Sequence, residues 1–190
     1  MDEQETRQVT DTRVLAAMSH PLRRRLMDVL KVYGPATAGR LADRTDQAVA
    51  NVSHHLKVLA AADLIVEVPE LARDRRERWW RLVAPGLRWA SGDFDDDPAR
   101  QAVADAAVSL NLDRHVNLAR AWFAAREARP AWNGAAFSTD KWLRLTPAEL
   151  NEVEQEILGV LDRWARREMP DDEQAREPVF LFAYGVPAQP

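Results

Sequence analysis

The chain has 190 residues, of which 46% are hydrophobic and 29% charged, a composition typical of an ordinary soluble protein with one large or two small domains. It contains no cysteine, which excludes disulfides and thiolate metal sites. The first twelve residues are unlike a signal peptide, and no apolar run approaches the roughly 18 residues that a membrane span requires. These features favour a cytoplasmic protein that does not bind a membrane.

Charge is distributed unevenly along the chain, whose net charge is −4. Residues 11–85 carry 13 Lys and Arg against 9 Asp and Glu, a net +4, whereas residues 91–190 carry 11 against 18, a net −7. Local charge decides contact with phosphate, because screening limits the reach of a surface charge to about 10 Å at ordinary salt. The acidic half therefore does not exclude nucleic-acid binding by the basic half.

Three helices are predicted in the basic half. The first follows residues 19–21, where Ser19 is placed to cap it and Pro21 suits its first turn, and it ends at residues 34–35, Gly-Pro. The second helix begins after Thr37, a second capping residue. The third covers about residues 48–62 and follows a tight turn, so the last two helices form a helix-turn-helix.

The helix predicted at 48–62 has two distinct faces. At about 100° per residue, Val52, Leu56 and Leu59 fall in one narrow sector that anchors the helix. The opposite side is free to touch base edges and phosphates in a DNA groove. His55 lies at the flank of the apolar stripe and is interpreted as a packed structural histidine. The residues assigned to DNA contact are Ala50, Asn51, Ser53, His54 and Lys57.

Residues 64–68 and 78–83 are rich in strand-forming residues and predict a hairpin with a charged tip. Such a tip can hold phosphates or enter a minor groove. A solvated loop is the alternative, but the position directly after a helix-turn-helix favours DNA contact. The arginines assigned to this contact are Arg73, Arg75, Arg76 and Arg78.

Residues 11–85 resemble the winged helix-turn-helix of the ArsR-type bacterial transcriptional regulators. The resemblance depends on SHPLR with the following Arg25-Leu26, on LADR at 41–44, on VSHHLKVL at 52–59 and on RWWRL at 78–82. In that family the fold is a dimer that sits over promoter DNA and usually represses. The resemblance therefore implies a homodimer that binds double-stranded operator DNA.

The chain departs from the family pattern at the turn, at the wing and in its metal ligands. Asp46 stands where glycine is common, and aspartate tolerates the left-handed backbone region; Asp74 likewise replaces a frequent glycine. The cysteine pairs of the metal-sensing members are missing. Asp113 and His115 supply only half of a zinc site that normally has three or four protein ligands. We expect no metal and no cofactor.

The predicted organisation is a polar tail at 1–10, the winged helix-turn-helix at 11–85, a linker at 86–97 and a C-terminal region at 98–190. A long helix is predicted from about residue 98 to residue 129. The phase of its apolar positions shifts, which favours a dimer seam, with a kinked helix inside a monomer as the alternative. These positions are Val103, Ala106, Ala107 and Leu110, then Val116, Ala119, Trp122 and Phe123.

The rest of the C-terminal region is predicted to be α+β. Residues 146–149, Thr-Pro-Ala-Glu, form a capping box that begins a helix with an apolar stripe from Leu150 to Trp164. Residues 137–145 and 179–186 are predicted as strands that pair antiparallel. The fold class is therefore mainly α with small β: an N-terminal winged helix-turn-helix domain followed by a C-terminal α+β dimerisation and effector region.

Four tryptophans in the acidic half suggest two interpretations. They either line a pocket for a small hydrophobic or aromatic effector or fill the core of a domain of about 100 residues. An effector bound there must favour one dimer geometry over another to release DNA. The four residues are Trp122, Trp132, Trp142 and Trp164.

These features favour a sequence-specific DNA-binding transcriptional regulator, a dimeric repressor relieved by a non-thiolate effector. An enzyme is disfavoured because the chain has no Gly-rich phosphate loop, nucleophile elbow or paired metal-ligand motif. A winged helix that only contacts proteins is the alternative, although it needs neither the polar stripe nor the arginine-rich tip.

Overall fold

The computed structural model describes residues 7–74, 76–84, 86–89, 94 and 97–189, and the chain divides into two compact units, Met1–Val116 (unit 1) and Asn117–Pro190 (unit 2). No helix in the described part of the chain combines the length and the apolar character needed to cross a membrane. Unit 1 contains, in order, β1 (Arg7–Gln8), α1 (Thr12–Met18), α2 (Pro21–Tyr33), β2 (Ala36–Thr37), α3 (Ala38–Thr45), α4 (Val49–Ala61), β3 (Ile65–Glu67), η1 (Pro69–Leu71), β4 (Trp79–Leu82), β5 (Leu87–Arg88) and α5 (Pro98–Ala125) as far as Val116. Unit 2 contains the end of α5, η3 (Arg126–Ala128), η4 (Pro130–Trp132) and α6 (Pro147–Arg166).

The helices of unit 1 begin at residues whose side chains cap them. Thr37 caps α3, as predicted. The prediction for α2 was wrong in one respect, because its N-cap is His20, whose Nδ1 accepts the Leu22 N–H at 3.1 Å. Ser19 instead donates its hydroxyl to the Leu15 carbonyl at the end of α1, a helix that the sequence pattern did not reveal.

The turn between α3 and α4 contains the left-handed residue that the sequence predicts. Asp46 has φ 54° and ψ 53°, and its N–H donates to the Ala42 carbonyl. The Gln47 N–H donates to the same carbonyl at 3.0 Å. Together these bonds satisfy the end of α3 and redirect the chain into α4 within a few residues.

Strand β4 is the centre of a three-stranded antiparallel sheet in the order β2-β4-β3. Ile65 lies opposite Leu82, and Ala36 lies opposite Trp80. The hairpin predicted from residues 64–68 and 78–83 is thus confirmed as β3 and β4. Its third strand, β2, and the parallel pair of β1 with β5 join segments that are far apart in the sequence, and they were not predicted.

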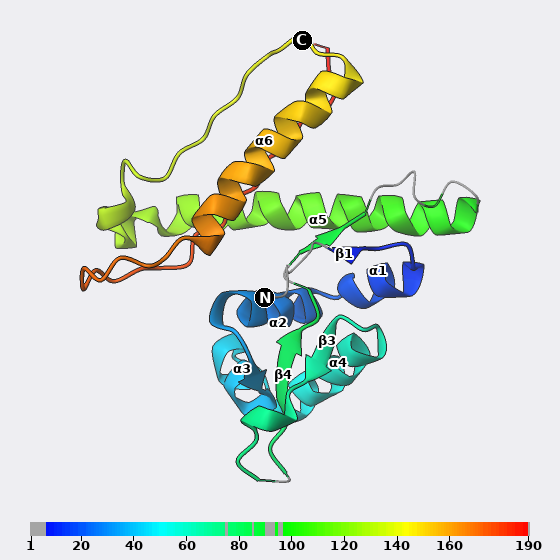
Figure 1. Cartoon of the computed structure of the whole chain (residues 1–190), viewed down its shortest axis with the longest axis vertical. Helices are drawn as coiled ribbons and strands as arrows, with labels where there is room; N and C mark the ends of the chain where they lie inside the picture. Colours follow the sequence, from blue (N-terminus) through cyan, green and yellow to red (C-terminus); the bar gives the residue numbers. More distant parts are fainter. Residues whose placement is uncertain (1–6, 75, 85, 90–93, 95–96, 190) are drawn as a thin grey trace. The chain divides into compact units, whose positions relative to one another are not determined.

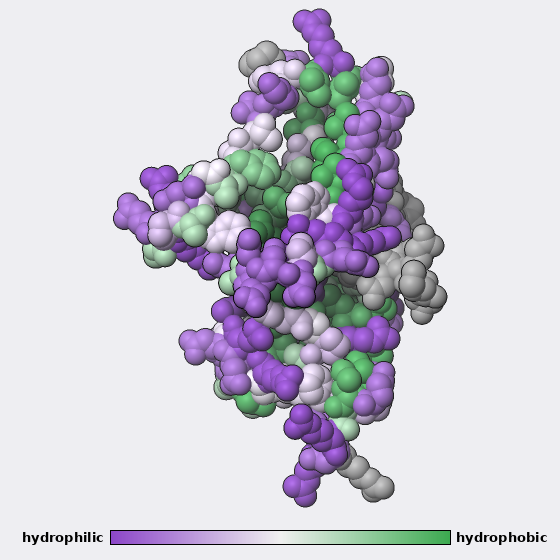
Figure 2. All heavy atoms as spheres, turned by 60° about the vertical axis from the view of Figure 1, so that its left-hand side comes forward, coloured by the Kyte–Doolittle hydropathy of each residue, from purple (hydrophilic) through white to green (hydrophobic). Residues whose placement is uncertain are grey.

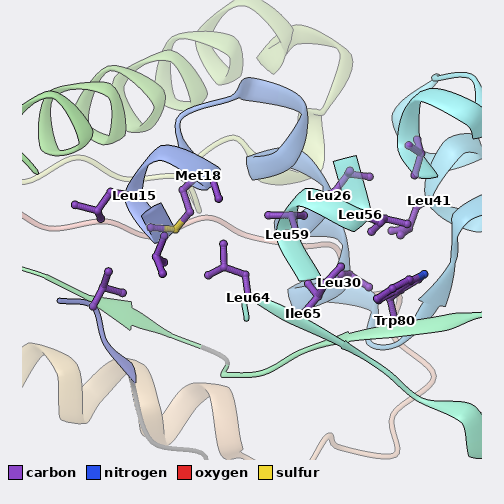
Figure 3. Close-up of a cluster of buried hydrophobic side chains, with 14 of the residues drawn as sticks. Leu15, Met18, Leu26, Leu30, Leu41, Leu56, Leu59, Leu64, Ile65 and Trp80 are labelled. Atoms are coloured by element: carbon purple, nitrogen blue, oxygen red, sulfur yellow. The ribbon is translucent and has the colours of Figure 1, made fainter. Parts of the chain in front are cut away.

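The core of unit 1 collects side chains from α1 to α5 and from the three-stranded sheet (Figure 3). The predicted anchors of α4 are among its most buried members, with 0% of Val52, 1% of Leu56 and 0% of Leu59 exposed. Around them lie Leu15, Met18, Leu26, Leu30, Leu41, Leu64, Ile65 and Trp80.

Unit 1 extends beyond the segment predicted as its DNA-binding domain. Phe94 is 1% exposed and Ala104, on α5, is fully buried in the same core. The predicted linker at 86–97 thus contributes β5 and Phe94 to unit 1, because its polar sequence also contains apolar residues that pack in the core. Its residues 90–93 and 95–96 lie outside the described part of the chain. Val9 lies within the segment predicted as a polar tail, yet it is 2% exposed and packs in this core.

Polar contacts join α5 to α2 within unit 1. Arg114 pairs with Asp28, and Arg24 donates to the side-chain oxygen of Asn111. The part of α5 that belongs to unit 1 is therefore joined to α2 by an ion pair and a hydrogen bond, and Ala104 of the same part is buried in the core.

Unit 2 is helical rather than α+β. No strand is present in its described residues, 117–189, so the strands predicted at 137–145 and 179–186 are wrong. Alternation of apolar residues makes a segment suitable for a strand, but a strand forms only where a second segment completes its hydrogen bonds. Helix α6 does begin at the predicted capping box, with the Thr146 N–H donating to the Glu149 carboxylate at 2.7 Å and the Glu149 N–H donating to Oγ1 of Thr146 at 3.3 Å.

Much of the apolar surface of unit 2 is exposed. Helix α6 buries none of its residues, and hydrophobic side chains are visible at the surface in the upper part of Figure 2. The most exposed large apolar residues of unit 2 are Phe123, Phe137, Trp142, Leu143, Trp164, Met169, Val179 and Val186.

Candidate nucleic-acid interface

Helix α4 presents the polar stripe that the sequence predicts. With Val52, Leu56 and Leu59 buried, the opposite side of the helix faces outward. Of the residues assigned to DNA contact on α4, Ser53 is half-buried and the others, Ala50, Asn51, His54 and Lys57, are exposed. The structure therefore brings all five to one accessible surface.

The first turn of α4 adds polar groups that the sequence analysis missed. Asn51 donates its amide to Oε1 of Gln47 at 3.1 Å, and Gln47 donates to the Asp46 carbonyl at 2.8 Å. The N-cap, Ala48, provides no side-chain hydrogen bond, which leaves first-turn N–H groups to an external acceptor such as a phosphate oxygen. An amide side chain directly before a predicted helix is the signal that could have identified Gln47.

His55 packs beneath this surface, as predicted. It is 7% exposed, and its ring lies 4.4 Å from that of His20 and 5.3 Å from that of His54, between ring centroids. Burial lowers the pKa of His55, and the nearby charges of His20, Arg23 and His54 lower it further. The neutral imidazole therefore supports the exposed His54 without adding charge to the interior.

The tip of the β3–β4 hairpin is held by its acidic residues. Oδ1 of Asp74 accepts the N–H groups of Arg76 at 2.7 Å and Glu77 at 3.1 Å, while Glu77 accepts the Arg73 N–H at 2.9 Å. The loop projects from the lower end of unit 1 in Figure 1 and is hydrophilic in Figure 2. Arg73 and Arg76 are exposed there, and Arg75 lies outside the described residues.

The fourth predicted wing arginine, Arg78, stands at the base of the hairpin. Its Nε lies 3.8 Å from Oε1 of Glu67, and its side chain is 66% exposed. An exposed pair of this kind contributes only about 0–1 kcal/mol. Arg78 is therefore free to exchange Glu67 for a phosphate at little cost.

Two further arginines, on α3, were not among the predicted site residues. The guanidinium of Arg40 lies 4.5 Å from the ring centroid of Trp79, and that of Arg44 lies 3.7 Å from the ring of Tyr33. Both arginines are exposed, and stacking orients their charges. The sequence shows that the two arginines lie four residues apart on one helix. It does not show their aromatic partners, because these lie on other elements.

The four tryptophans of the acidic half differ in how far they are exposed. Trp142 and Trp164 have 65% and 61% of their surface exposed, and neither is enclosed within the chain. Trp122 and Trp132 are half-buried, and Trp132 donates its Nε1–H to a carboxylate oxygen of Glu177 at 3.1 Å. A pocket lined by these four residues, and a core filled by them, both stay predictions.

The residues of the candidate zinc half-site lie on α5. His115 is half-buried, and burial lowers the pKa of its imidazole. Among the described residues, no group of three metal-ligating side chains is placed to hold an ion.

Comparisons with known proteins agree with the geometry of α2 to α4. Residues 18–68 match the family described as "Helix-turn-helix domain". A curated relative, the transcriptional repressor SdpR of Bacillus subtilis, is 40% identical over 52 residues. The match covers 27% of this chain and 57% of the repressor, so the chain spans little more than half the length of this relative.

Two solved structures show a more distant likeness. The YusO protein of Bacillus subtilis is 14% identical, with a TM-score of 0.34, over 80% of this chain and 84% of that one. The transcriptional regulator Tm0710 of Thermotoga maritima is 12% identical, with a TM-score of 0.33, over 84% and 90% of the two chains. By its own elements and by the family match, the segment at residues 18–68 is a helix-turn-helix domain.

Proposed function

We propose that this protein is a sequence-specific DNA-binding transcriptional regulator that resembles the ArsR type and acts as a homodimeric repressor. The observation that carries the proposal is the exposed polar stripe of α4, held outward by a fully buried stripe on the opposite side. A helix fixed in this way can enter a major groove without moving its own core. The basic hairpin tip beside it supplies phosphate contacts.

In this proposal α4 reads the bases and the hairpin holds the flanking backbone. Ser53 and His54 reach base edges, Asn51 exchanges its bond with Gln47 for an adenine, and Lys57 meets a phosphate. Ala50 contacts a thymine methyl group. A dimer places two copies of α4 in successive major grooves, with half-sites about 34 Å apart.

The exposed surface of α5 supports the homodimer. Within unit 1, Ala104 marks the side of α5 that is buried in the core, and apolar side chains remain exposed on both sides of it. Val103 and Leu110 lie on one flank with 39% and 50% exposure, and Val108 and Leu112 lie on the other with 39% and 41%. A second copy of the chain would cover at least one of these flanks.

The same proposal includes an effector that relieves repression. Because the chain has no cysteine, this effector is not a metal held by thiolates. It acts by favouring a dimer geometry in which the two copies of α4 no longer fit adjacent grooves.

The proposal is tested by fluorescence anisotropy on the DNA that flanks the protein's own gene and on random DNA, over a series of salt concentrations. We expect Ser53→Ala and His54→Ala to weaken binding to the cognate site by about 1–3 kcal/mol and to relax its sequence preference. We expect Lys57→Ala to weaken binding to both DNAs equally and to reduce the salt slope by about 1.

The matched control is Lys141→Ala, which removes an exposed lysine from unit 2 and leaves both affinities unchanged. Equal losses for all three α4 variants on both DNAs would contradict the assignment of base contacts. A folded protein that ignores duplex DNA at low salt would contradict the proposal as a whole and favour a winged helix that contacts proteins.

A further inference from the structure

A cavity of about 430 Å³ opens in unit 1, between α1, the beginning of α2 and the last turn of α4. Its apolar lining includes Val14 and Ala17 of α1 and Val58 of α4. None of the DNA-contact residues proposed above lines it. The cavity is large enough for a molecule with a short hydrocarbon body.

Three guanidinium groups and two carboxylates line the same cavity. Arg13 and Asp11 neutralise each other, because Nη2 of Arg13 lies 2.7 Å from Oδ2 of Asp11 and its Nε donates to the same oxygen at 2.9 Å. The remaining acidic residue is Asp63, and the remaining guanidiniums are those of Arg7 and Arg23. The lining therefore carries an excess of positive charge.

The guanidinium groups of Arg7 and Arg23 donate hydrogen bonds to uncharged backbone carbonyls. Arg23 donates to the Ala16 carbonyl at 3.1 Å and to the Ala17 carbonyl, and Arg7 donates to the backbone carbonyl of Asp63. Carbonyl oxygens carry only partial charge, so they stabilise a guanidinium less than a carboxylate does. Burial lowers the pKa of Arg23, as expected for a cation whose surroundings do not fully compensate its charge.

We propose that this cavity binds a small amphipathic carboxylate. Its hydrocarbon body rests on Val14, Ala17 and Val58, and its carboxylate accepts hydrogen bonds from Arg7 and Arg23. A lining that combines apolar side chains with the guanidinium groups of Arg7 and Arg23 favours such a molecule over inorganic phosphate, which has no apolar part to bury.

The cavity also contacts the helix proposed to read DNA. Val58 and Ala61 belong to the last turn of α4, and Ala62 is its C-cap. A ligand there packs against the end of the helix whose earlier turns carry the polar stripe. This step depends on the proposed function: the carboxylate is expected to change DNA affinity because it binds the free and the DNA-bound arrangements of α4 unequally.

The binding site is tested by isothermal titration calorimetry of the full chain with hexanoate, hexanamide and inorganic phosphate. Hexanoate is expected to bind at least about tenfold more tightly than the other two, since only it combines a hydrocarbon body with a full negative charge. Ala61→Leu, which places a larger side chain in the cavity from an exposed position, should abolish binding. Arg7→Gln should reduce it about tenfold.

The matched control for Arg7→Gln is Arg144→Gln, in unit 2, which should leave hexanoate binding unchanged. Equal binding of hexanoate and hexanamide, tighter binding of phosphate, or hexanoate binding that survives Ala61→Leu overturns the proposed site. Arg23 is not used as the test position, because its bonds to the end of α1 also hold that helix.

DNA affinity with and without hexanoate separates this inference from the proposed function. A shift of at least about threefold in wild-type protein, lost in Ala61→Leu, supports the coupling. Hexanoate binding with unchanged DNA affinity overturns the coupling but not the site. Failure to bind DNA at all overturns the proposed function, and the calorimetry then still decides whether the site exists.

Discussion

Unit 1 buries many of its large apolar side chains, whereas unit 2 leaves many of its own exposed. In unit 1, Leu41 and Leu56 are 0% and 1% exposed, whereas Phe137 and Trp142 of unit 2 are 77% and 65% exposed. Unit 1 thus completes a core within one chain. Unit 2 has a well-capped helix without a buried residue, so its apolar surface remains to be covered, which agrees with the proposed dimer.

The largest expected effect is on the stability of unit 1. Leu56→Ala should lower the free energy of unfolding by about 2–5 kcal/mol, because it leaves a cavity in a packed core. Phe137→Ala, an even larger truncation, should cost less than about 0.5 kcal/mol in a single chain. Urea denaturation followed by circular dichroism measures both, and equal losses would break the contrast between the units.

The next effect concerns assembly. Leu110→Arg places a charge on the exposed flank of α5 and should raise the dimer dissociation constant at least tenfold, about 1.4 kcal/mol, in analytical ultracentrifugation. Val32→Arg is the matched control, since Val32 of α2 is 51% exposed and Leu110 is 50% exposed. Wild-type protein that stays monomeric at every concentration, or a dimer indifferent to Leu110→Arg, would argue against this seam.

A smaller effect is expected at the helix caps. Thr146→Ala removes the capping box of α6 and should destabilise that helix by about 1 kcal/mol, with a measurable loss of helical circular dichroism. Thr37→Ala removes the cap of α3, but that helix keeps its signal because Leu41 and Ala42 hold it in the core. Equal loss of the helical signal in both variants would contradict the idea that core packing holds α3 but not α6.

The smallest effect is the pH dependence of unit 1. Because burial lowers the pKa of His55 in the folded state, the unfolded chain binds this proton more readily, and stability is lost as the pH falls below the ordinary value of 6.5. The groups facing His55 are His20 and Arg23 of the α2 region and His54 of α4, and each makes the added charge less favourable. Denaturation midpoints measured from about pH 7.5 to about pH 5.5 should decline less steeply in His55→Gln than in wild type. His54→Gln is the exposed control. If only this control changes how steeply the denaturation midpoint declines with pH, the assignment of that decline to His55 is contradicted.

The helices and the hairpin were predictable because their signals are local. Apolar spacing and the cap at Thr37 placed α3 and α4, and the capping box at Thr146 placed α6. The left-handed backbone at Asp46 followed from the tolerance of aspartate for that region. The accessibility of Asn51, His54 and Lys57 followed from their angle to the buried stripe, whereas their contacts with DNA stay a prediction.

What the sequence did not reveal depends on partners that are distant along the chain. The pairing of β1 with β5 and of β2 with β4 joins segments separated by many residues, and two-residue strands leave almost no pattern. Residues 137–145 and 179–186 have the alternation of strands but no completed ladder. The stacking of Arg40 on Trp79 and the arginines of the 430 Å³ cavity likewise arise only when separate elements meet.

The register of β4 constrains how this hairpin can vary among related sequences. Thr37, which caps α3, lies opposite Trp79, and Trp80 lies opposite Ala36 with only 9% of its surface exposed. A one-residue insertion within β4 would turn Trp80 from the core to solvent and disconnect the hairpin from the start of α3. Insertions between Leu71 and Glu77 would leave that pairing untouched. The tip of the hairpin can therefore change in length while the base of the hairpin keeps its register.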